Sequence, residues 1–542
     1  MNLLQQILLL CIQKKLSNRK INFYASIFLV CFICQVNSSS AQPKYEFRGV
    51  WVATVDNIDW PSQKYLSTDS QKIEFIKLLE MHQRNGMNAI IAQIRPATDA
   101  FYPSQYEPWS EWLTGTQGKP PVPYYDPLEF MITETHKRGM EFHAWMNPYR
   151  AEFSIGKSSI SQTHITKLHP DWFLPYGTIK IFDPGNKEVQ QFVTNVVRDV
   201  VRRYDVDAIH FDDYFYPYRI AGKEFPDSVS FAKYGNGLNK EDWRRSNVDS
   251  IILTLSKAIK QEKKYCKFGI SPFGVWRNSD KDPEGSNTKA GQTNYDDLYA
   301  DILLWLKNKW IDYAAPQLYW EFSQPKVPFA TLIDWWSKHA YGRQLYIGQG
   351  IYRAQESKSV AWKNPDELPN QIKKLREYPQ VQGSIYFSSK TFEKNPNGWN
   401  DSLQKNYYKY PAIIPPMGWI DNKKPVRPSI FFDSNLCCNV KDFLKINIKR
   451  DSVVSKVNRF IIYSFPDFSL MYTSNPKNIV TIINSSEKEF NYDLKNIPAD
   501  QNKIIIGVTM ITNTNVESNL SRYIYLKRKQ DGWQISSNDS NN

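Results

Sequence analysis

Segments with two different hydrophobic periods alternate along the chain from Phe47 to about Tyr410. Short apolar or alternating runs are typical of strands, and longer runs with a period near 3.6 residues are typical of helices. Strands are expected at 47–55, 88–95, 141–148, 206–211, 267–275, 311–319, 344–351 and 382–387, and helices at 71–84, 126–138, 187–204, 241–260, 296–307, 329–339, 365–377 and 400–407. Eight strands, each followed by a helix, predict an α/β fold with a closed (β/α)8 TIM barrel over residues 42–412.

A doubly wound open sheet is the alternative arrangement for this alternation. Such sheets normally carry a glycine-rich phosphate-binding turn directly after the first strand. The corresponding stretch, Arg48-Gly49-Val50-Trp51, is no such turn. The barrel is therefore favoured. The sequence contains no phosphate loop or dinucleotide fingerprint, so no organic cofactor is expected.

The helical period disappears after Tyr410. A Pro-Pro pair at 415–416 marks a linker, and short alternating strands follow between 429 and 527. This pattern is typical of a small β-sandwich, so we expect a fibronectin type III-like domain over residues 425–530. The polar residues 531–542 are expected to form a disordered tail.

Residues 1–41 have the outline of a signal peptide. A basic segment ends at Lys20, an apolar run covers 21–36, and small residues at 39–41 offer a cleavage point. The run is short for a spanning helix, so we expect cleavage and only transient membrane contact. The protein is expected to be exported, to the periplasm or the cell envelope; lipid attachment at Cys31 or Cys34 is the alternative.

Composition narrows the classes of partner. Aromatic residues make up 14% of the chain, and aromatic-rich surfaces are common in proteins that handle carbohydrate. The net charge of +13 suits a polyanionic partner or a soluble basic surface, but no long basic run supports nucleic-acid binding. Outside the expected signal peptide, Cys266 is isolated, and the neighbours Cys437 and Cys438 would pair only with strain. No disulfide is expected to be essential to the fold.

Polar side chains recur with strand parity and locate a candidate site. The pairs or triplets on one face are Gln93 and Arg95, Trp145 and Asn147, His210 and Asp212, and Gln317, Tyr319 and Glu321. The opposite faces are apolar. Because the outward face of a barrel packs on helices, the polar faces are expected inside the barrel or at its mouth.

Asp212 and Asp213 directly follow an expected buried strand and precede a cluster of tyrosines. Two neighbouring carboxylates are costly to hold there unless they bind or react with something. The alternative is that the two aspartates cap the following turn.

Several motifs, in this order, are similar to those of the bacterial glycosyl-hydrolase-like ten family. They are Glu46–Val55 with Asp59-Trp60-Pro61, Asn88–Pro96, His143–Arg150, Asp207–Tyr218, Gly269–Trp276 and Ala315–Glu321. The resemblance covers about residues 45–410 and implies a (β/α)8 barrel, export and glycoside hydrolysis. That family includes a hydrolase of denuded peptidoglycan strands.

The stretch 207–212 also resembles the fourth strand of α-amylase-type barrels, in which the last aspartate, here Asp212, is the nucleophile. His210 stands where those enzymes have arginine. The stretch further resembles the chitinase strand, but Tyr214 stands at the position of the chitinase acid. This departure argues against the chitinase mechanism, in which the acetamido group of the substrate attacks.

Glycoside hydrolysis requires one carboxyl group that holds a proton and one that is ionised. We expect Asp212 to be ionised and Asp213 to support it or to bind a sugar hydroxyl. Glu321 is the expected acid, because its aromatic surroundings favour a protonated carboxyl group; a solvated loop carboxylate is the alternative. Asp56 and Asp99 are the competing second carboxylates.

The remaining candidates are expected to contact substrate. The groups for sugar hydroxyls or for orienting the carboxylates are Asp56, His143, Asn147, Arg150, His210, Tyr214, Gln317 and Tyr319; those for stacking on sugar rings are Trp51, Trp145, Trp276 and Trp320; and those for an acidic group such as the lactyl carboxylate of muramic acid are Arg95 and Arg277. The alternative for His143, and for each tryptophan alone, is a place in the core.

Two other functions would use the same residues. A metal-dependent hydrolase would use His143, His210, Asp212 and Asp213, although no His-x-His or HExxH pattern is present. A non-catalytic carbohydrate-binding barrel would keep the aromatic residues without turnover. We predict a glycoside hydrolase without a metal, acting on a cell-wall glycan strand or a related polysaccharide.

Overall fold

The computed structural model describes residues 42–432, 440–449 and 457–537. Its first domain is a barrel of parallel strands in eight positions: β1 (Phe47–Val52), β2 (Ala89–Arg95), β3 (Glu141–Met146), β7 (Ala208–Phe211), β8 (Lys267–Ile270), β9 (Tyr313–Ala314) continued by β10 (Gln317–Leu318), β11 (Gln344–Gln349) and β12 (Gly383–Tyr386). Each strand pairs in parallel with the next, and β12 pairs with β1. The predicted (β/α)8 barrel is confirmed.

The sixth strand position is the irregular one. Pro316 lies between β9 and β10 and has no N–H to contribute to the ladder. Its carbonyl oxygen still accepts a hydrogen bond from the N–H of Gly348 in β11 at 2.9 Å. The strand therefore ends at Leu318, earlier than the sequence pattern predicts.

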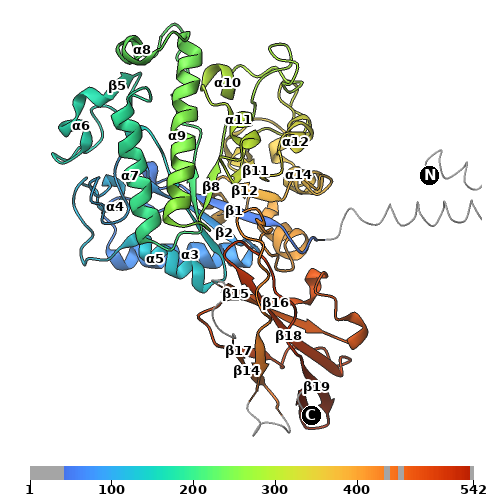
Figure 1. Ribbon diagram of the computed structural model, residues 1–542. Coiled ribbons are helices and arrows are strands. Elements are labelled where there is room, and N and C mark those ends of the chain that lie inside the picture. The colour runs from blue at the N-terminus through green and yellow to red at the C-terminus, as the bar shows by residue number, and fades with distance from the viewer. Residues whose placement is uncertain (1–41, 433–439, 450–456, 538–542) are drawn as a thin grey trace, which may run out of the picture. The chain divides into compact units, whose positions relative to one another are not determined.

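Helices follow the strands and cover the outside of the barrel (Figure 1). The main ones are α3 (Thr68–Arg84), α5 (Pro127–Lys137), α7 (Lys187–Arg203), α9 (Lys240–Glu262), α11 (Ile302–Lys307), α12 (Phe329–Lys338) and α14 (Glu367–Leu375). Shorter ones are α4 (Glu111–Thr114), α6 (Ile165–Leu168), α8 (Ser228–Tyr234), α10 (Asn294–Asp297), α13 (Arg353–Glu356), α15 (Ser389–Glu393) and α16 (Trp399–Ser402). The helix expected over 296–307 is split into α10 and α11, because Tyr299 has a φ of 52° and Asp301 caps the start of α11.

The two faces of the barrel strands separate as the parity predicts. Ile94, Ile209 and Phe211 belong to the outer core that the helices cover. Trp51 and Tyr313 belong to a second cluster inside the barrel. The inward faces therefore hold the polar and aromatic side chains from which a site is built.

A small antiparallel sheet is inserted between β3 and α7. It consists of β4 (Arg150–Glu152), β6 (Ile179–Phe182) and β5 (Phe173–Tyr176), in that order. Because β4 begins at Arg150, the sheet fixes the backbone of that residue beside the end of β3.

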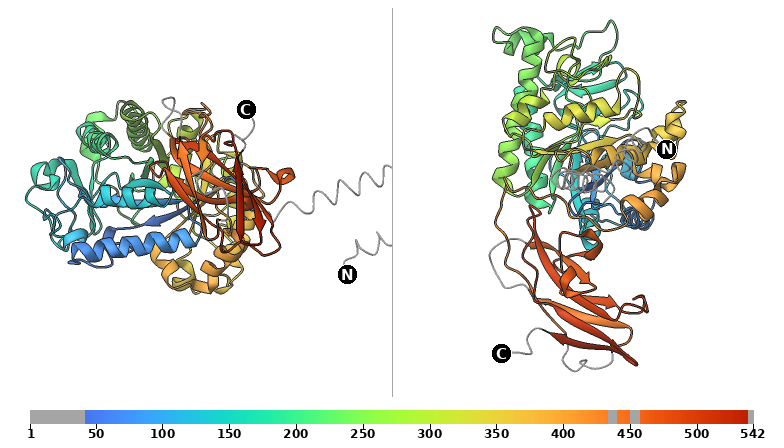
Figure 2. Two further views of the ribbon diagram at one scale, coloured as in Figure 1. Left: turned by 90° about the horizontal axis from the view of Figure 1, so that it is seen from below. Right: turned by 90° about the vertical axis from the view of Figure 1, so that its right-hand side faces the viewer.

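The second domain is an antiparallel sandwich, drawn in orange to red in Figures 1 and 2. One sheet has the order β13 (Ser429–Phe431), β14 (Phe443–Lys449) and β17 (Glu489–Asp493); the other has the order β16 (Ile479–Asn484), β15 (Val457–Phe465), β18 (Lys503–Thr512), β19 (Ile524–Lys529) and β20 (Gly532–Ser537). Side chains of both sheets, including Leu444 and Ile506, share one core. The predicted all-β second domain is confirmed.

The prediction of a disordered tail is wrong for residues 532–537. Residues 532–537 form β20, which pairs with β19 in an antiparallel hairpin. Trp533 and Ile535 are buried in the sandwich core, which the polar composition of the segment conceals. Residues 538–542 lie outside the described residues.

Of the features expected from the cysteines and the N-terminus, only Cys266 lies among the described residues. Cys266 is buried and unpaired, whereas Cys437, Cys438 and the expected signal peptide at 1–41 lie outside the described residues. None of the described helices is long and apolar enough to cross a membrane.

Candidate active site

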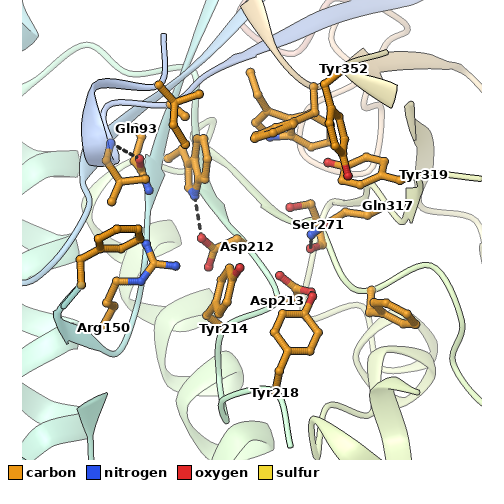
Figure 3. A pocket seen from close by; sticks show the side chains of 18 of the residues that line it. Gln93, Arg150, Asp212, Asp213, Tyr214, Tyr218, Ser271, Gln317, Tyr319 and Tyr352 are labelled. Carbon is orange, nitrogen blue, oxygen red and sulfur yellow. Dashed lines mark hydrogen bonds between the residues drawn. The ribbon is translucent and has the colours of Figure 1, made fainter. Parts of the chain in front are cut away.

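A pocket of about 390 Å³ lies where the barrel strands end at their carboxyl termini (Figure 3). Nine predicted site residues line it: Trp51, Trp145, Arg150, Asp212, Asp213, Tyr214, Gln317, Tyr319 and Trp320. Asp212 and Asp213 are its only lining carboxylates within the described part of the chain. They enter the pocket side by side directly after β7, with Tyr319 and Tyr352 across from them (Figure 3).

Asp212 is buried and held by two donors from the end of β3. Oδ2 accepts hydrogen bonds from Nε1 of Trp145 and from Nδ2 of Asn147, both at 3.0 Å. Oδ1 accepts a longer bond, 3.2 Å, from the same amide, and the backbone N–H of Tyr214 also donates to the carboxylate. The Asn147 amide is itself oriented, because its Oδ1 accepts the N–H of Arg150 at 2.8 Å. The carboxylate is therefore fixed, and its side-chain donors lie closer to Oδ2 than to Oδ1.

The two carboxyl groups have different electrostatic surroundings. Burial raises the pKa of Asp212, and the charge of Arg150 and the bonds from Trp145 and Asn147 oppose that rise. Burial, and then the negative charge of Asp212, raise the pKa of Asp213 to about 6. Asp213 is thus the better proton holder of the pair, which a glycosidase acid requires.

Tyrosine hydroxyls and aromatic rings surround the pair. The Tyr218 hydroxyl donates to Oδ2 of Asp213 at 2.5 Å. The ring of Tyr319 stacks on Phe387 with centroids 5.9 Å apart, and the rings of Phe273 and Trp320 meet edge to face at 5.6 Å. Flat apolar surfaces beside hydrogen-bonding groups match a sugar ring, which has apolar faces and a polar rim.

His143 and His210 lie inside the barrel, below the pocket. The indole N–H of Trp51 can only donate, so Nε2 of His210 accepts it, at 3.1 Å. Nδ1 of His210 then donates to the Tyr313 hydroxyl at 2.9 Å, and that hydroxyl donates to Nδ1 of His143 at 2.9 Å. Nε2 of His143 donates to Glu141 at 3.0 Å. Both histidines are thereby held beneath Trp51, so the structure does not place them against substrate.

The chain of hydrogen bonds ends in a buried charge cluster. Glu141 is bonded by Lys267 at 2.5 Å, and by Arg459 and Asn515 of the sandwich at 3.1 and 2.9 Å. Burial alone would raise the pKa of Glu141, but Lys267, His143 and Arg459 hold it well below its usual range. The sandwich therefore helps to neutralise a carboxylate at the base of the barrel.

The structure does not bring Glu321 into the pocket. The strand ends at Leu318, and Glu321 accepts a hydrogen bond from Ser359 at 3.2 Å in a partly exposed loop. Asp56 is exposed in the loop after β1, and Asp99, whose pKa burial raises to about 7, lies outside the pocket lining. Neither competing carboxylate faces the aspartate pair.

Three more candidates have other partners. Arg95 forms a buried ion pair with Glu107. Arg277 bridges Asp282 and Asp296, both at 2.8 Å. Trp276 stacks on Trp335, with centroids 6.1 Å apart. The expected fifth strand ends at Ile270, so residues 276 and 277 belong to a loop outside the pocket.

Several lining residues were given no role in the site by the sequence. They are Ala53, Val55, Ile58, Gln93, Phe153, Tyr218, Ser271, Phe273, Tyr352, Arg353 and Phe387. Gln93 shares the inward parity of β2 and holds the loop after β1, because its Oε1 accepts the N–H of Thr54 and of Val55. Phe387 directly follows β12. Parity already places Gln93 on the inward face, and inspection of every residue at a strand end would have found Phe387.

The metal-dependent alternative requires both histidines to converge with the aspartates. Their ring nitrogens instead bond to Trp51, Tyr313 and Glu141. No cluster of three or more metal-binding side chains occurs within 42–432, 440–449 and 457–537. The described residues therefore do not support this alternative.

A (β/α)8 barrel with a buried carboxylate pair in an aromatic pocket at the carboxyl ends of its strands is the arrangement of a glycoside hydrolase. The family described as Glycosyl hydrolase-like 10 matches residues 46–364. The chain belongs to this family, as its motifs predict.

Curated relatives extend the match beyond that segment. Glycosyl hydrolase YngK of Bacillus subtilis (strain 168) is 48% identical over 416 residues, 76% of this chain and 81% of that protein. Glycosyl hydrolase DigH of Escherichia coli (strain K12) is 37% identical over 377 residues, 65% and 84% of the two chains. The solved glycoside hydrolase domain of PgaB (BpsB) from Bordetella bronchiseptica is 12% identical, with a TM-score of 0.45 over 66% of this chain and 98% of that one.

Proposed function

We propose that this glycoside hydrolase is exported and cleaves the glycan strands of a bacterial cell wall. The observation that carries the proposal is the Asp212–Asp213 pair, buried in a pocket walled by aromatic rings. The family motifs and the signal-like residues 1–41 favour the same substrate and location.

Two arginines support an acidic sugar as the substrate. Arg150 and Arg353 line the pocket, and neither forms an ion pair with another described residue. The Arg150 guanidinium lies over the Tyr214 ring, 4.6 Å from its centroid. An unpaired guanidinium beside a sugar site suits a carboxylate such as the lactyl group of muramic acid. The sequence assigned the binding of an acidic group to Arg95 and Arg277, but both form ion pairs with carboxylates of the protein. Arg150 and Arg353 replace them in this role.

The chemistry assigns one role to each aspartate. Asp213 holds a proton and delivers it to the oxygen of the leaving sugar. Asp212 stays ionised and faces the positive charge that develops at the anomeric carbon. Glu321 has no part in this scheme.

The substrate is tested with purified protein lacking residues 1–41. Reducing ends and product masses are measured after incubation with glycan strands freed of stem peptides, with intact peptidoglycan, and with neutral polysaccharides. We expect short glycans from the freed strands. Release only from a neutral polysaccharide would contradict the cell-wall assignment.

Export is tested separately by fractionating cells that produce the full chain. The expected result is a protein outside the cytoplasm, and sequencing its N-terminus locates the cleavage point. Accumulation of the uncleaved chain in the cytoplasm would contradict export.

A further inference from the structure

The two pocket carboxylates are consecutive residues. Their Cα atoms are therefore about 3.8 Å apart, and both side chains enter from the end of β7 (Figure 3). In the two usual mechanisms of glycoside hydrolysis, the acid and the nucleophile or base flank the glycosidic bond. No Asp or Glu among the described residues lines the pocket across from this pair. The pocket holds an acid but offers no carboxylate on the opposite side.

The contacts of Asp212 suit a different task. Two side-chain donors fix its Oδ2, whereas the side-chain bond to Oδ1 is the longer one, 3.2 Å from Asn147. Burial raises the pKa of this carboxyl group, and the charge of Arg150 opposes that rise and favours the ionised form. A fixed, ionised carboxylate is a good acceptor for an N–H group of the substrate.

We propose that the substrate supplies the nucleophile: the carbonyl oxygen of a 2-acetamido group on the sugar whose bond is broken. Asp212 accepts the N–H of that group, and Asp213 is the acid. The inference rests on the proposed glycosidase function and narrows its substrate to 2-acetamido sugars. Substrate-assisted glycosidases do not need a second carboxylate across the bond, because the acetamido oxygen takes the place of the enzyme's nucleophile. Tyr214 in place of the chitinase acid argues against this mechanism at the level of sequence, but Asp213 provides an acid in the same pocket.

An aromatic corner of the pocket fits the acetamido group. The rings of Trp51, Tyr319 and Phe387 pack together, with centroid distances of 6.5 Å (Trp51–Tyr319, edge-on), 6.3 Å (Trp51–Phe387, tilted) and 5.9 Å (Tyr319–Phe387, stacked). The Tyr319 hydroxyl has no hydrogen bond to another described residue and faces the aspartates across the pocket. The rings shield the methyl group, and this hydroxyl donates to the carbonyl oxygen.

The reaction balances without a further reagent. The acetamido oxygen forms a bond to the anomeric carbon while the glycosidic C–O bond breaks, and Asp213 gives its proton to the leaving oxygen. Asp212 stabilises the positive charge on the nitrogen of the resulting bicyclic oxazolinium ion. Water then attacks the anomeric carbon, Asp213 takes the water proton, and the ring opens to restore the acetamido group.

The test is equilibrium binding of the thiazoline of N,N′-diacetylchitobiose, a stable sulfur analogue of the bicyclic intermediate. Calorimetry compares the thiazoline with diacetylchitobiose itself, on the wild type and on Asp212→Asn and Asp213→Asn. Asp171→Asn is the matched control, because Asp171 is exposed and lies outside the pocket lining.

We expect the wild type to bind the thiazoline at least about 100-fold more tightly than the disaccharide. Asp212→Asn should lose roughly 10- to 100-fold in thiazoline affinity, because it removes a charged acceptor. Asp171→Asn should bind as the wild type does. Equal affinity of the wild type for the two ligands, or an unchanged thiazoline affinity in a folded Asp212→Asn, would overturn the proposal.

A second measurement uses only the wild type and guards against a variant that fails to fold. Glycan strands whose amino groups carry trifluoroacetyl in place of acetyl should be cleaved about tenfold more slowly or worse, because fluorine withdraws electrons from the attacking oxygen. Equal rates would overturn the inference and leave the glycosidase function standing. Tight thiazoline binding without release of products from cell-wall strands would instead contradict only the proposal that these strands are the substrate.

Discussion

Trp145 donates its indole N–H to Oδ2 of Asp212 at 3.0 Å, a bond that links the end of β3 to the end of β7. The bond stabilises the ionised carboxylate and fixes its direction. Trp145→Phe keeps an aromatic ring in the pocket and removes the donor. We expect kcat to fall roughly 10- to 100-fold, the range for a hydrogen bond to a charged group. A kcat within twofold of the wild type would show that this bond does not support turnover.

The pH dependence of activity should report Asp213. Its pKa is raised to about 6 by burial and by the Asp212 charge, so the acid loses its proton as the pH rises through about 6. We expect kcat/KM to fall above that pH. An activity that stays constant between pH 6 and 8 would exclude Asp213 as the acid.

The same shift predicts a stability effect with a definite sign. A carboxyl group whose pKa rises from 3.8 to about 6 on folding favours the folded state only while protonated, so stability is lost as the pH rises through this window. The rise of this pKa from 3.8 to about 6 corresponds to about 3 kcal/mol. Asp213→Asn should therefore be more stable than the wild type towards urea at pH 7.5, and no more stable at pH 3.5.

Tyr313 is a structural link between two buried histidines. Tyr313→Phe leaves both Nδ1 atoms without their partner and should lower the free energy of unfolding by about 2–4 kcal/mol. Tyr346→Phe is the matched control, since the Tyr346 hydroxyl is buried without a hydrogen bond in the described structure and its ring lies 5.1 Å from that of Tyr313. The control should be neutral or stabilising. Equal losses in the two variants would contradict the assigned chain of hydrogen bonds.

Arg459 should couple the sandwich to the stability of the barrel. Arg459→Met removes one partner of buried Glu141 and should cost about 1–3 kcal/mol at neutral pH. Because the Glu141 pKa is lowered in the folded state, its stabilising contribution is present at neutral pH and is lost as the pH falls. The difference between variant and wild type should therefore shrink in acid. Lys445→Met, which removes an exposed pair with Glu489, is the control and should change stability by less than about 0.5 kcal/mol.

Glu321→Gln should keep most of the activity. Glu321 lies outside the pocket lining and bonds to Ser359, so its charge is not required at the reacting atoms. We expect kcat/KM on the cleaved glycan to stay within about threefold of the wild type. A loss of about a thousandfold would restore Glu321 as the acid and remove Asp213 from that role.

The barrel was predictable because its strands are buried apolar runs bounded by polar residues, and parity correctly assigned Trp145, His210 and Gln317 to the inward face. Parity shows on which face of the strand a side chain lies, but not how far the residue is from the pocket end of the strand. His210 shares a face with Asp212 but lies one layer lower, where its ring supports Trp51. The sequence pattern alone could not separate a supporting residue from a pocket residue.

Parity also fails beyond the end of a strand. Pro316 interrupts the sixth strand and the chain leaves the barrel after Leu318, so the predicted alternation of 317, 319 and 321 does not continue to Glu321. Tyr352 caps the start of α13 and Arg353 is its first residue, and the path of the chain between β11 and this helix depends on tertiary packing. The pattern of hydrophobic residues contains no information on that path.

The central claim, that Asp212 and Asp213 perform the hydrolysis, is tested most directly by turnover of the glycan strands that the wild type cleaves. Release of reducing ends is measured for the wild type, Asp212→Asn, Asp213→Asn and the exposed control Asp171→Asn, with folding verified by circular dichroism. The account predicts that each pocket variant loses about a thousandfold or more in kcat and that the control is unchanged. A folded Asp212→Asn variant that releases glycans at the wild-type rate would contradict it.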